Sequence, residues 1–124
     1  MIDFNNASFM KLNNASVQDA AKLLDGVIIP GEAIISAFKG IRDWVVFTDK
    51  RVIAVNVQGM TGKKRDFTSL PYSHIQAYSV ETAGHFDLDA ELEMWFSGLG
   101  KVKLEFASGV DIRAIGQFIA GRIL

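Results

Sequence analysis

Cysteine is absent from the 124 residues of the chain, and proline occurs only twice, at Pro30 and Pro71. Without cysteine, the protein has no disulfides, no thiolate metal site and no cysteine nucleophile. The fold must therefore be stabilised by packing alone. A reducing compartment is compatible with this composition.

A strong charge of one sign is also absent, because the formal net charge is -1. Such a chain has no broad field that would attract nucleic acid phosphates or an anionic membrane, so binding of either would need a local basic patch. We expect no nucleic-acid partner.

Long apolar runs are missing as well. None approaches the ~20 residues that a membrane-spanning helix requires. The opening Met1–Asn6 carries an acid and asparagines where a secretory signal would carry basic residues followed by an apolar stretch. The expectation is a soluble cytoplasmic protein.

The length fits one domain, residues 1–124, with a single core. Its first part, 1–30, contains a short helix that begins after the N-cap Ser16, has Asp19 in its first turn and ends at Gly26. Residues 1–14, ahead of this helix, are expected to be partly irregular. The apolar stripe of this helix is small and rich in alanine, so we expect it to dock on a larger surface. The stripe consists of Val17, Ala20, Ala21 and Leu24.

Residues 31–107 consist of short runs rich in β-branched and aromatic residues, separated by turn residues at regular spacing. This pattern is typical of an all-β sandwich or barrel, and the short connections favour antiparallel neighbours. We predict seven strands: 32–39, 43–48, 51–57, 63–70, 74–82, 87–96 and 101–106.

The segment 86–96 has the clearest alternation, with apolar residues on one face and mostly charged residues on the other. Pairing of Met94 with Val102 in the following strand would place Glu93 opposite Lys103, a favourable cross-strand pair. The residues expected to point inward are Phe86, Leu88, Ala90, Leu92, Met94, Phe96, Val102, Leu104 and Phe106.

Two strands are apolar on both faces, at Ile34-Ile35 and at 44–47. One face must line the interior, and the other needs cover from the N-terminal helix or from another subunit. Trp95, on an otherwise charged face, is a further candidate contact. The interface candidates are Ile35, Trp44, Val46 and Trp95.

Residues 109–124 are predicted to form a C-terminal helix with an isoleucine stripe at positions 112, 115, 119 and 123. Gly116 and Gly121 lower helix propensity, which suggests close backbone packing at both positions.

Strands followed by one amphipathic helix give the element order of pleckstrin-homology domains. Several segments of the sequence resemble the bacterial pleckstrin-homology-like family over most of the chain. They are Phe47-Thr48-Asp49-Lys50-Arg51-Val52-Ile53, Leu70-Pro71-Tyr72-Ser73-His74-Ile75, Val80-Glu81-Thr82-Ala83-Gly84 and Asp87-Leu88-Asp89-Ala90-Glu91-Leu92.

This resemblance implies a mainly β fold with helices, a barrel of two strongly bent, near-orthogonal sheets capped by the C-terminal helix. It also implies symmetric homo-oligomers, often rings, and implies no catalysis. Phosphoinositide binding belongs to a subset of eukaryotic relatives that carry a dense basic motif in the loop between the first two strands. Here that loop, residues 38–43, has only two basic residues.

One basic constellation suggests a binding site, because the first and third inter-strand loops should lie at the same end of the fold. Together these residues would hold a phosphate or an acidic peptide. The alternative, which we favour at this stage, is that they are solvated loop charges interleaved with Asp43 and Asp66. The constellation is Lys39, Arg42, Lys63, Lys64 and Arg65.

Other sites have less support. Carboxylates two residues apart on a strand lie ~6.6–7 Å apart, too far to close around one ion with His85, so we expect no metal. His74 has no identifiable catalytic partner, and the glycines of 58–64 lack the P-loop spacing, so we expect no nucleotide and no cofactor.

Three functions are compatible with these observations. The first is a non-enzymatic, homo-oligomeric interaction domain, and the second is a membrane-surface or anionic-ligand module. The third, a small-molecule-binding barrel or enzyme, would need a deep cavity with convergent polar groups.

Overall fold

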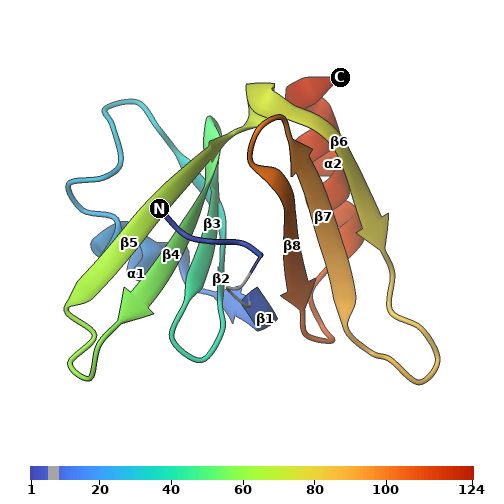
Figure 1. Cartoon of the computed structure of the whole chain (residues 1–124), viewed down its shortest axis with the longest axis horizontal. Helices are drawn as coiled ribbons and strands as arrows, with labels where there is room; N and C mark the ends of the chain where they lie inside the picture. Colours follow the sequence, from blue (N-terminus) through green and yellow to red (C-terminus); the bar gives the residue numbers. More distant parts are fainter. Residues whose placement is uncertain (6–8) are drawn as a thin grey trace. The chain divides into compact units, whose positions relative to one another are not determined.

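The computed structural model describes residues 1–5 and 9–124, and the chain divides into two compact units (Figure 1). Unit 1 comprises residues 1–2 and 14–71, and unit 2 comprises residues 3–13 and 72–124. The described residues form a mainly β fold with two α-helices, as the sequence predicts, and contain eight strands where seven were expected. The near-orthogonal crossing of two sheets stays a prediction.

Unit 1 contains four antiparallel strands in the order β5-β4-β3-β2. The tight turn between β3 and β4 is organised by Thr48, whose hydroxyl accepts hydrogen bonds from the backbone N–H groups of Lys50 and Arg51 at 3.1 and 3.0 Å. The strands are β2 (Ile34–Lys39), β3 (Trp44–Thr48), β4 (Arg51–Gln58) and β5 (Lys64–Pro71).

Helix α1 (Val17–Leu23) covers one face of this sheet. The predicted cap is confirmed: Ser16 Oγ accepts a hydrogen bond from the N–H of Asp19 at 3.1 Å. The predicted stripe is wrong in part, because Val17 and Ala21 are exposed whereas Ala20 and Leu24 are fully buried. Those two pack in one core cluster with Ala37, Trp44, Val46, Ile53 and Val55.

A clamp of Glu32, Arg51 and Thr48 ties the segment after α1 to the sheet. Arg51 donates from Nε and Nη2 to the two carboxylate oxygens of Glu32 at 2.9 and 2.8 Å, and Thr48 donates to Glu32 Oε2 at 2.7 Å. Arg51 also donates to the carbonyl of Val27 at 2.9 Å. No ion pair of Arg51 was predicted from the sequence, because its partner Glu32 lies 19 residues away.

Unit 2 holds the second set of strands, in the order β1-β8-β7-β6. Strand β1 pairs with β8 in parallel, and the other neighbours are antiparallel. The predicted hairpin register is confirmed, with Met94 opposite Val102 and Glu93 opposite Lys103. The strands are β1 (Phe9–Ala15, whose last two residues belong to unit 1), β6 (Ile75–Glu81), β7 (Ala90–Phe96) and β8 (Gly100–Phe106).

Strand β1 was not predicted, since the N-terminal segment was expected to be partly irregular. The sequence of β1 does not resemble that of a strand, because Asn13 and Asn14 disfavour strands and Lys11 adopts a left-handed φ of 52° that breaks the alternation. The expectation also covered residues 6–8, which lie outside the described residues. The other predicted strands, except the one at 87–96, begin and end within two residues of those observed.

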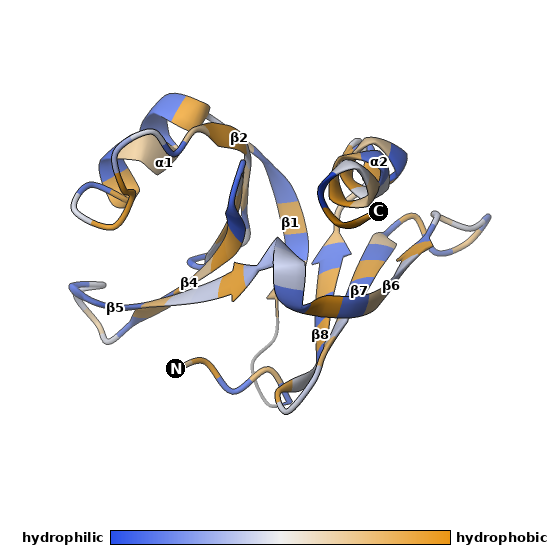
Figure 2. Ribbon diagram, turned by 90° about the horizontal axis from the view of Figure 1, so that it is seen from above, coloured by the Kyte–Doolittle hydropathy of each residue, from blue (hydrophilic) through white to orange (hydrophobic). Residues whose placement is uncertain are grey.

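Strand β7 begins at Ala90, three residues later than predicted, and alternating hydrophobic and hydrophilic bands run along it (Figure 2). The prediction that Phe86 and Leu88 point inward is wrong, because these side chains are 97% and 59% exposed. The chain turns there instead: the N–H of Gly84 donates to the carbonyl of Asp87 at 2.6 Å, and Asp87 Oδ1 accepts from the N–H of Asp89 at 3.1 Å. The Asp87 carboxylate thus competes with the hydrogen bonds between strands for the backbone N–H groups of this segment.

Helix α2 (Ile112–Ile123) packs on β6, β7 and the short 3₁₀ turn Tyr72–His74. It begins three residues later than predicted, after the N-cap Asp111. Close packing is confirmed at Gly116, where a Cβ would lie 2.7 Å from Val80 Cγ2, but is wrong for Gly121, which faces open space. Among residues 1–5 and 9–124, neither helix has the length and apolar character needed to cross a bilayer.

Candidate functional site

An open groove of about 370 Å³ lies in unit 1, between the β2–β3 loop (residues 40–43) and the β4–β5 loop (residues 59–63). We call it the basic groove. Apolar and cationic side chains alternate around it. It is lined by Leu23, Lys39, Ile41, Arg42, Trp44, Val57, Met60, Thr61, Gly62 and Arg65.

The two loops are held together by polar contacts. Arg42 Nη2 donates to the carbonyl of Gly59, and Asp43 Oδ1 accepts from the N–H of Val57 at 2.9 Å and from Asn56 Nδ2 at 3.2 Å. These bonds link residues far apart in sequence, so the loops take one arrangement relative to each other. This is how the fold brings the first and third inter-strand loops to one end of the unit 1 sheet.

Gly62 lets the second loop approach the first. Its φ of 67° lies in the left-handed region, and an added Cβ would stand 3.3 Å from Val57 Cγ1 and 3.5 Å from Arg42 Nη2. A side chain at this position would therefore be strained and would press on the groove wall.

Trp44 contributes an aromatic surface to the groove. The Lys39 ammonium lies 5.3 Å from the centre of the Trp44 ring, within the range of a cation–π contact. The rest of the Trp44 side chain packs under α1, so this residue is 9% exposed. The groove thus has a rigid aromatic base with a cation above it.

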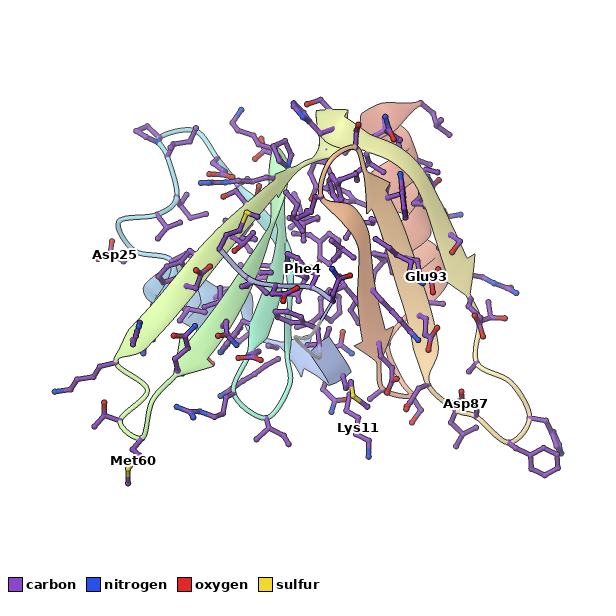
Figure 3. All side chains as sticks on the ribbon, in the orientation of Figure 1. Phe4, Lys11, Asp25, Met60, Asp87 and Glu93 are labelled. Carbon is purple, nitrogen blue, oxygen red and sulfur yellow. The ribbon has the colours of Figure 1, made fainter. Side chains whose placement is uncertain are left out.

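Two apolar side chains stand at the loop tips. Ile41 is 97% exposed and Met60 is fully exposed, and Met60 projects from its loop away from the strands (Figure 3). Removing apolar side chains this exposed from water, by contact with a partner, would lower the free energy. Neither residue was predicted from the sequence as part of a site. The available signal was an apolar residue placed between turn residues, at Gly40-Ile41-Arg42 and Gly59-Met60-Thr61.

The structure brings the five predicted basic residues to the same two loops and their flanking strands. Lys39, Arg42 and Arg65 line the groove, whereas Lys63 and Lys64 are exposed beside it and do not line it. Arg65 stands on β5, opposite Val57. Within the described chain, none of the five forms an ion pair with an acid.

Asp43 and Asp66, the two acids interleaved with these cations in the sequence, have other partners. Asp43 accepts the backbone and amide bonds given above. Asp66 lies 3.0 Å from the N-terminal amino group and accepts a 2.7 Å hydrogen bond from Thr68. That Thr68 bond and the charge of the N-terminus hold the pKa of Asp66 below its usual value. Neither carboxylate neutralises the groove cations.

The four interface candidates have different surroundings. Trp44 and Val46 are buried in the core cluster with α1, so the prediction that they meet another subunit is not compatible with their burial; the helix provides the alternative cover. Ile35 is 45% exposed. Trp95 is 50% exposed on the outer side of β7, opposite Ala77 and Lys101 in the neighbouring strands.

The carboxylates of unit 2 form a different environment. In the described residues, no group of three or more His, Asp or Glu side chains is placed to hold a metal ion. Lys101 and Lys103 pair diagonally with Glu93 and Glu91, at 3.8 and 3.2 Å. Burial, together with a hydrogen bond and charge from Asp89, raises the pKa of Glu105. His74 is exposed at the end of its 3₁₀ turn.

Comparison with known proteins covers nearly the whole chain. Residues 3–123 match the model of the bacterial PH domain. The uncharacterized protein YjqA of Bacillus subtilis strain 168 is 47% identical over 111 residues, which cover 88% of this chain and 86% of that protein.

Two solved structures are similar. One is a DUF1696 family protein with a pleckstrin-homology domain from Shewanella loihica PV-4, with a TM-score of 0.81 and 38% identity over 93% of this chain and 99% of that one. The other is a pleckstrin homology domain from Shewanella amazonensis SB2B, with a TM-score of 0.69 and 39% identity over 96% of this chain and 93% of that one. The chain therefore belongs to the bacterial PH domain family.

Proposed function

We propose that the protein is a non-enzymatic binding module that docks on an anionic membrane surface through the basic groove and its two loop tips. The observation that carries the proposal is the combination of two exposed apolar tips, Ile41 and Met60, with five cations that have no acidic partner in the described chain. The proposal places the protein in the cytoplasm, because anionic lipids concentrate in the cytoplasmic leaflet.

The chemistry of the site matches that of a membrane surface. Lipid headgroups present phosphates to Lys and Arg, and the region below them accepts apolar side chains. The groove offers both kinds of contact within two adjacent loops, whereas a net charge of -1 offers no general attraction. Local geometry, rather than bulk charge, supports this function.

The magnitudes are those of a reversible contact. Each basic residue near an anionic surface contributes about 1 kcal/mol, and a fully buried aliphatic side chain contributes about 1.5–3 kcal/mol. Five cations and two partly inserted apolar tips are thus enough for peripheral binding, and binding should weaken as salt screens the charges.

Sedimentation with vesicles tests the proposal. At low ionic strength the protein should sediment with vesicles of phosphatidylglycerol and phosphatidylcholine, and much less with phosphatidylcholine alone. Removing two charges that line the groove by K39Q with R65Q should weaken binding roughly thirtyfold, from a loss of about 2 kcal/mol.

The matched control is K11Q with K50Q, which makes the same charge change at exposed sites outside the groove. It should bind nearly as the unmodified protein does. Failure of the unmodified protein to sediment with anionic vesicles, or an equal loss in the control, would show that the groove is not a membrane-docking site.

A second candidate is assembly into a homo-oligomer. The observation that favours it is that two aromatic side chains of unit 2 are exposed, Phe86 at 97% and Trp95 at 50%. Exposed apolar surface of this kind is often an interaction surface. Light scattering after size-exclusion chromatography should show a mass above the 13.6 kDa of one chain; a monomer at every concentration would remove this candidate.

A further inference from the structure

Methionine supplies every sulfur atom of the chain, since cysteine is absent and four methionines are present. The four side chains differ widely in exposure to water. Met94 is completely buried and Met10 is 52% exposed, whereas Met1 is 85% exposed and Met60 is fully exposed. Oxidation of a thioether by an oxidant in water depends on access to the sulfur, so Met60 should react first.

The turn that carries Met60 holds its side chain away from the strands. The N–H of Gly62 donates a hydrogen bond to the carbonyl of Gly59 at 3.3 Å, so Met60 and Thr61 occupy the two central positions of a four-residue turn. The Arg42 guanidinium donates to the same carbonyl and ties the turn to the β2–β3 loop. Met60 therefore stands at a fixed corner and points into water (Figure 3).

Cations surround this corner of the basic groove. Lys63 follows the turn directly in sequence, and Arg42 and Arg65 line the groove together with Met60. Among the described residues, no acid forms an ion pair with these three cations. The local field is therefore positive, and it should raise the concentration of anionic oxidants such as hypochlorite near the thioether.

Oxidation would remove from Met60 the property that membrane docking requires. Hydrogen peroxide transfers one oxygen atom to the sulfur: an S–O bond forms, the O–O bond breaks, and water leaves. The sulfur is oxidised by two electrons and the peroxide is reduced by two. The apolar thioether becomes a polar sulfoxide. Moving a polar group out of water carries a free-energy cost, whereas moving the thioether carries a gain.

We propose that Met60 is a reversible oxidation site, and that its sulfoxide releases the protein from an anionic membrane. The proposal rests on the membrane function proposed above, in which the Met60 tip enters the lipid. Ile41, the other tip, is a hydrocarbon that peroxide does not oxidise, so oxidation weakens docking without abolishing it. A methionine sulfoxide reductase restores the thioether: two thiols become a disulfide, and the sulfoxide oxygen leaves as water.

Vesicle sedimentation before and after treatment with hydrogen peroxide tests the proposal. Peptide mass spectrometry should find the sulfoxide at Met60 and an unmodified thioether at the buried Met94. Oxidation should weaken binding of the unmodified protein to vesicles of phosphatidylglycerol and phosphatidylcholine roughly tenfold, because one of the two apolar tips is lost. Methionine sulfoxide reductase with dithiothreitol should restore the binding.

Three variants separate Met60 from the other oxidisable residues, and each is compared with its own untreated sample. M60L keeps an apolar tip without a thioether, so peroxide should leave its affinity unchanged. M10L removes an exposed methionine outside the groove, and it should lose affinity on treatment as the unmodified protein does. M60Q, whose tip is polar without oxidation, should bind as weakly as the oxidised protein. Circular dichroism checks that all three are folded.

The outcomes distinguish this proposal from the one on which it rests. Undiminished binding of a protein that mass spectrometry shows to be oxidised at Met60, or an equal loss in treated M60L, would overturn the switch and leave the membrane function intact. Failure of the reductase to restore binding would overturn its reversibility. An untreated protein that does not sediment with anionic vesicles would remove the membrane function, and the switch with it.

Discussion

The two units use charged residues in contrasting ways. In unit 1 three acids, Glu32, Asp43 and Asp66, are engaged by backbone amides, Thr48, Thr68, Arg51 and the N-terminus, and five cations are left around the groove. In unit 2 the strand lysines are paired with glutamates, and the acids of the β6–β7 loop are left without an ion-pair partner among the described residues. A net charge of -1 thus conceals two opposed local surfaces, and side-chain partners rather than composition decide which charges are available.

The largest effect should come from the clamp in unit 1. The Glu32 side chain has no exposed surface, and E32A would leave the Arg51 guanidinium without its carboxylate. We expect a loss of about 3–5 kcal/mol in the free energy of unfolding, measured by urea titration. D25A, at an exposed acid on the same unit, is the control and should change stability by less than about 0.5 kcal/mol. Similar values for the two variants would show that unit 1 does not depend on its engaged acids.

Acid should weaken the same clamp. The hydrogen bonds from Arg51 lower the pKa of Glu32 from 4.5 to about 2, against the opposing effect of burial, and the hydrogen bond from Thr48 lowers it further. Because the folded pKa is depressed, the stabilisation is complete above pH 4.5 and is lost as the pH falls from about 4.5 towards 2. Its size is of the order of 3 kcal/mol.

Urea titrations across this pH range check the effect. The E32Q variant should lose less stability over the range than the unmodified protein, because it has no carboxylate to protonate. Parallel curves for the two proteins would contradict the assignment.

Two glycines of α2 in unit 2 should respond to substitution by alanine with stability changes of opposite sign, both smaller than that of E32A. G116A places a methyl group 2.7 Å from Val80 Cγ2 and should destabilise by about 1–2 kcal/mol, after the gain in helix propensity. G121A meets open space and should stabilise by about 0.5–1 kcal/mol. Thermal unfolding should move in opposite directions, and adding V80A to G116A should restore part of the loss. Shifts of the same sign would show that α2 does not pack closely on β6 at Gly116.

The smallest effect should come from the surface charges of unit 2. The pair of Lys103 and Glu91, 3.2 Å apart, is partly exposed, and a double-mutant cycle should give a coupling far smaller than that of the Glu32–Arg51 clamp. Screening by salt should reduce it further. A coupling as large as that of the Glu32–Arg51 clamp would remove the contrast between the units.

The sequence predicts most of the fold because its signals are local. The alternation along β7 and β8, the N-cap at Ser16 and the isoleucines of α2 each arise from residues close together in the chain. Strand β1 escapes prediction because its partner, β8, is distant in sequence and its own residues resemble a loop. Phe86 and Leu88 continue the alternation in the sequence. Hydrogen bonds to Asp87 make the chain turn there, however, so strand β7 begins only after these two residues.

The sequence predicts which basic residues belong to the candidate site, but it does not predict the net charge of the site. The sequence names the five basic residues and the loops that carry them, but Asp43 and Asp66 are interleaved with them, which favoured the interpretation as solvated loop charges. Their actual partners, Val57 and the N-terminus, lie 14 and 65 residues away and cannot be read from spacing. The only sequence signal for the apolar tips, Ile41 and Met60, is an apolar residue that lies between turn residues.

Insertion of the loop tip into lipid is the central claim, and the absence of cysteine permits its most direct test. M60C, labelled with an environment-sensitive dye, should show a blue shift and brighter emission when phosphatidylglycerol vesicles are added. K50C, labelled at the β3–β4 turn away from the groove, should show no change. No change at position 60, or an equal change at both positions, would contradict docking through the basic groove.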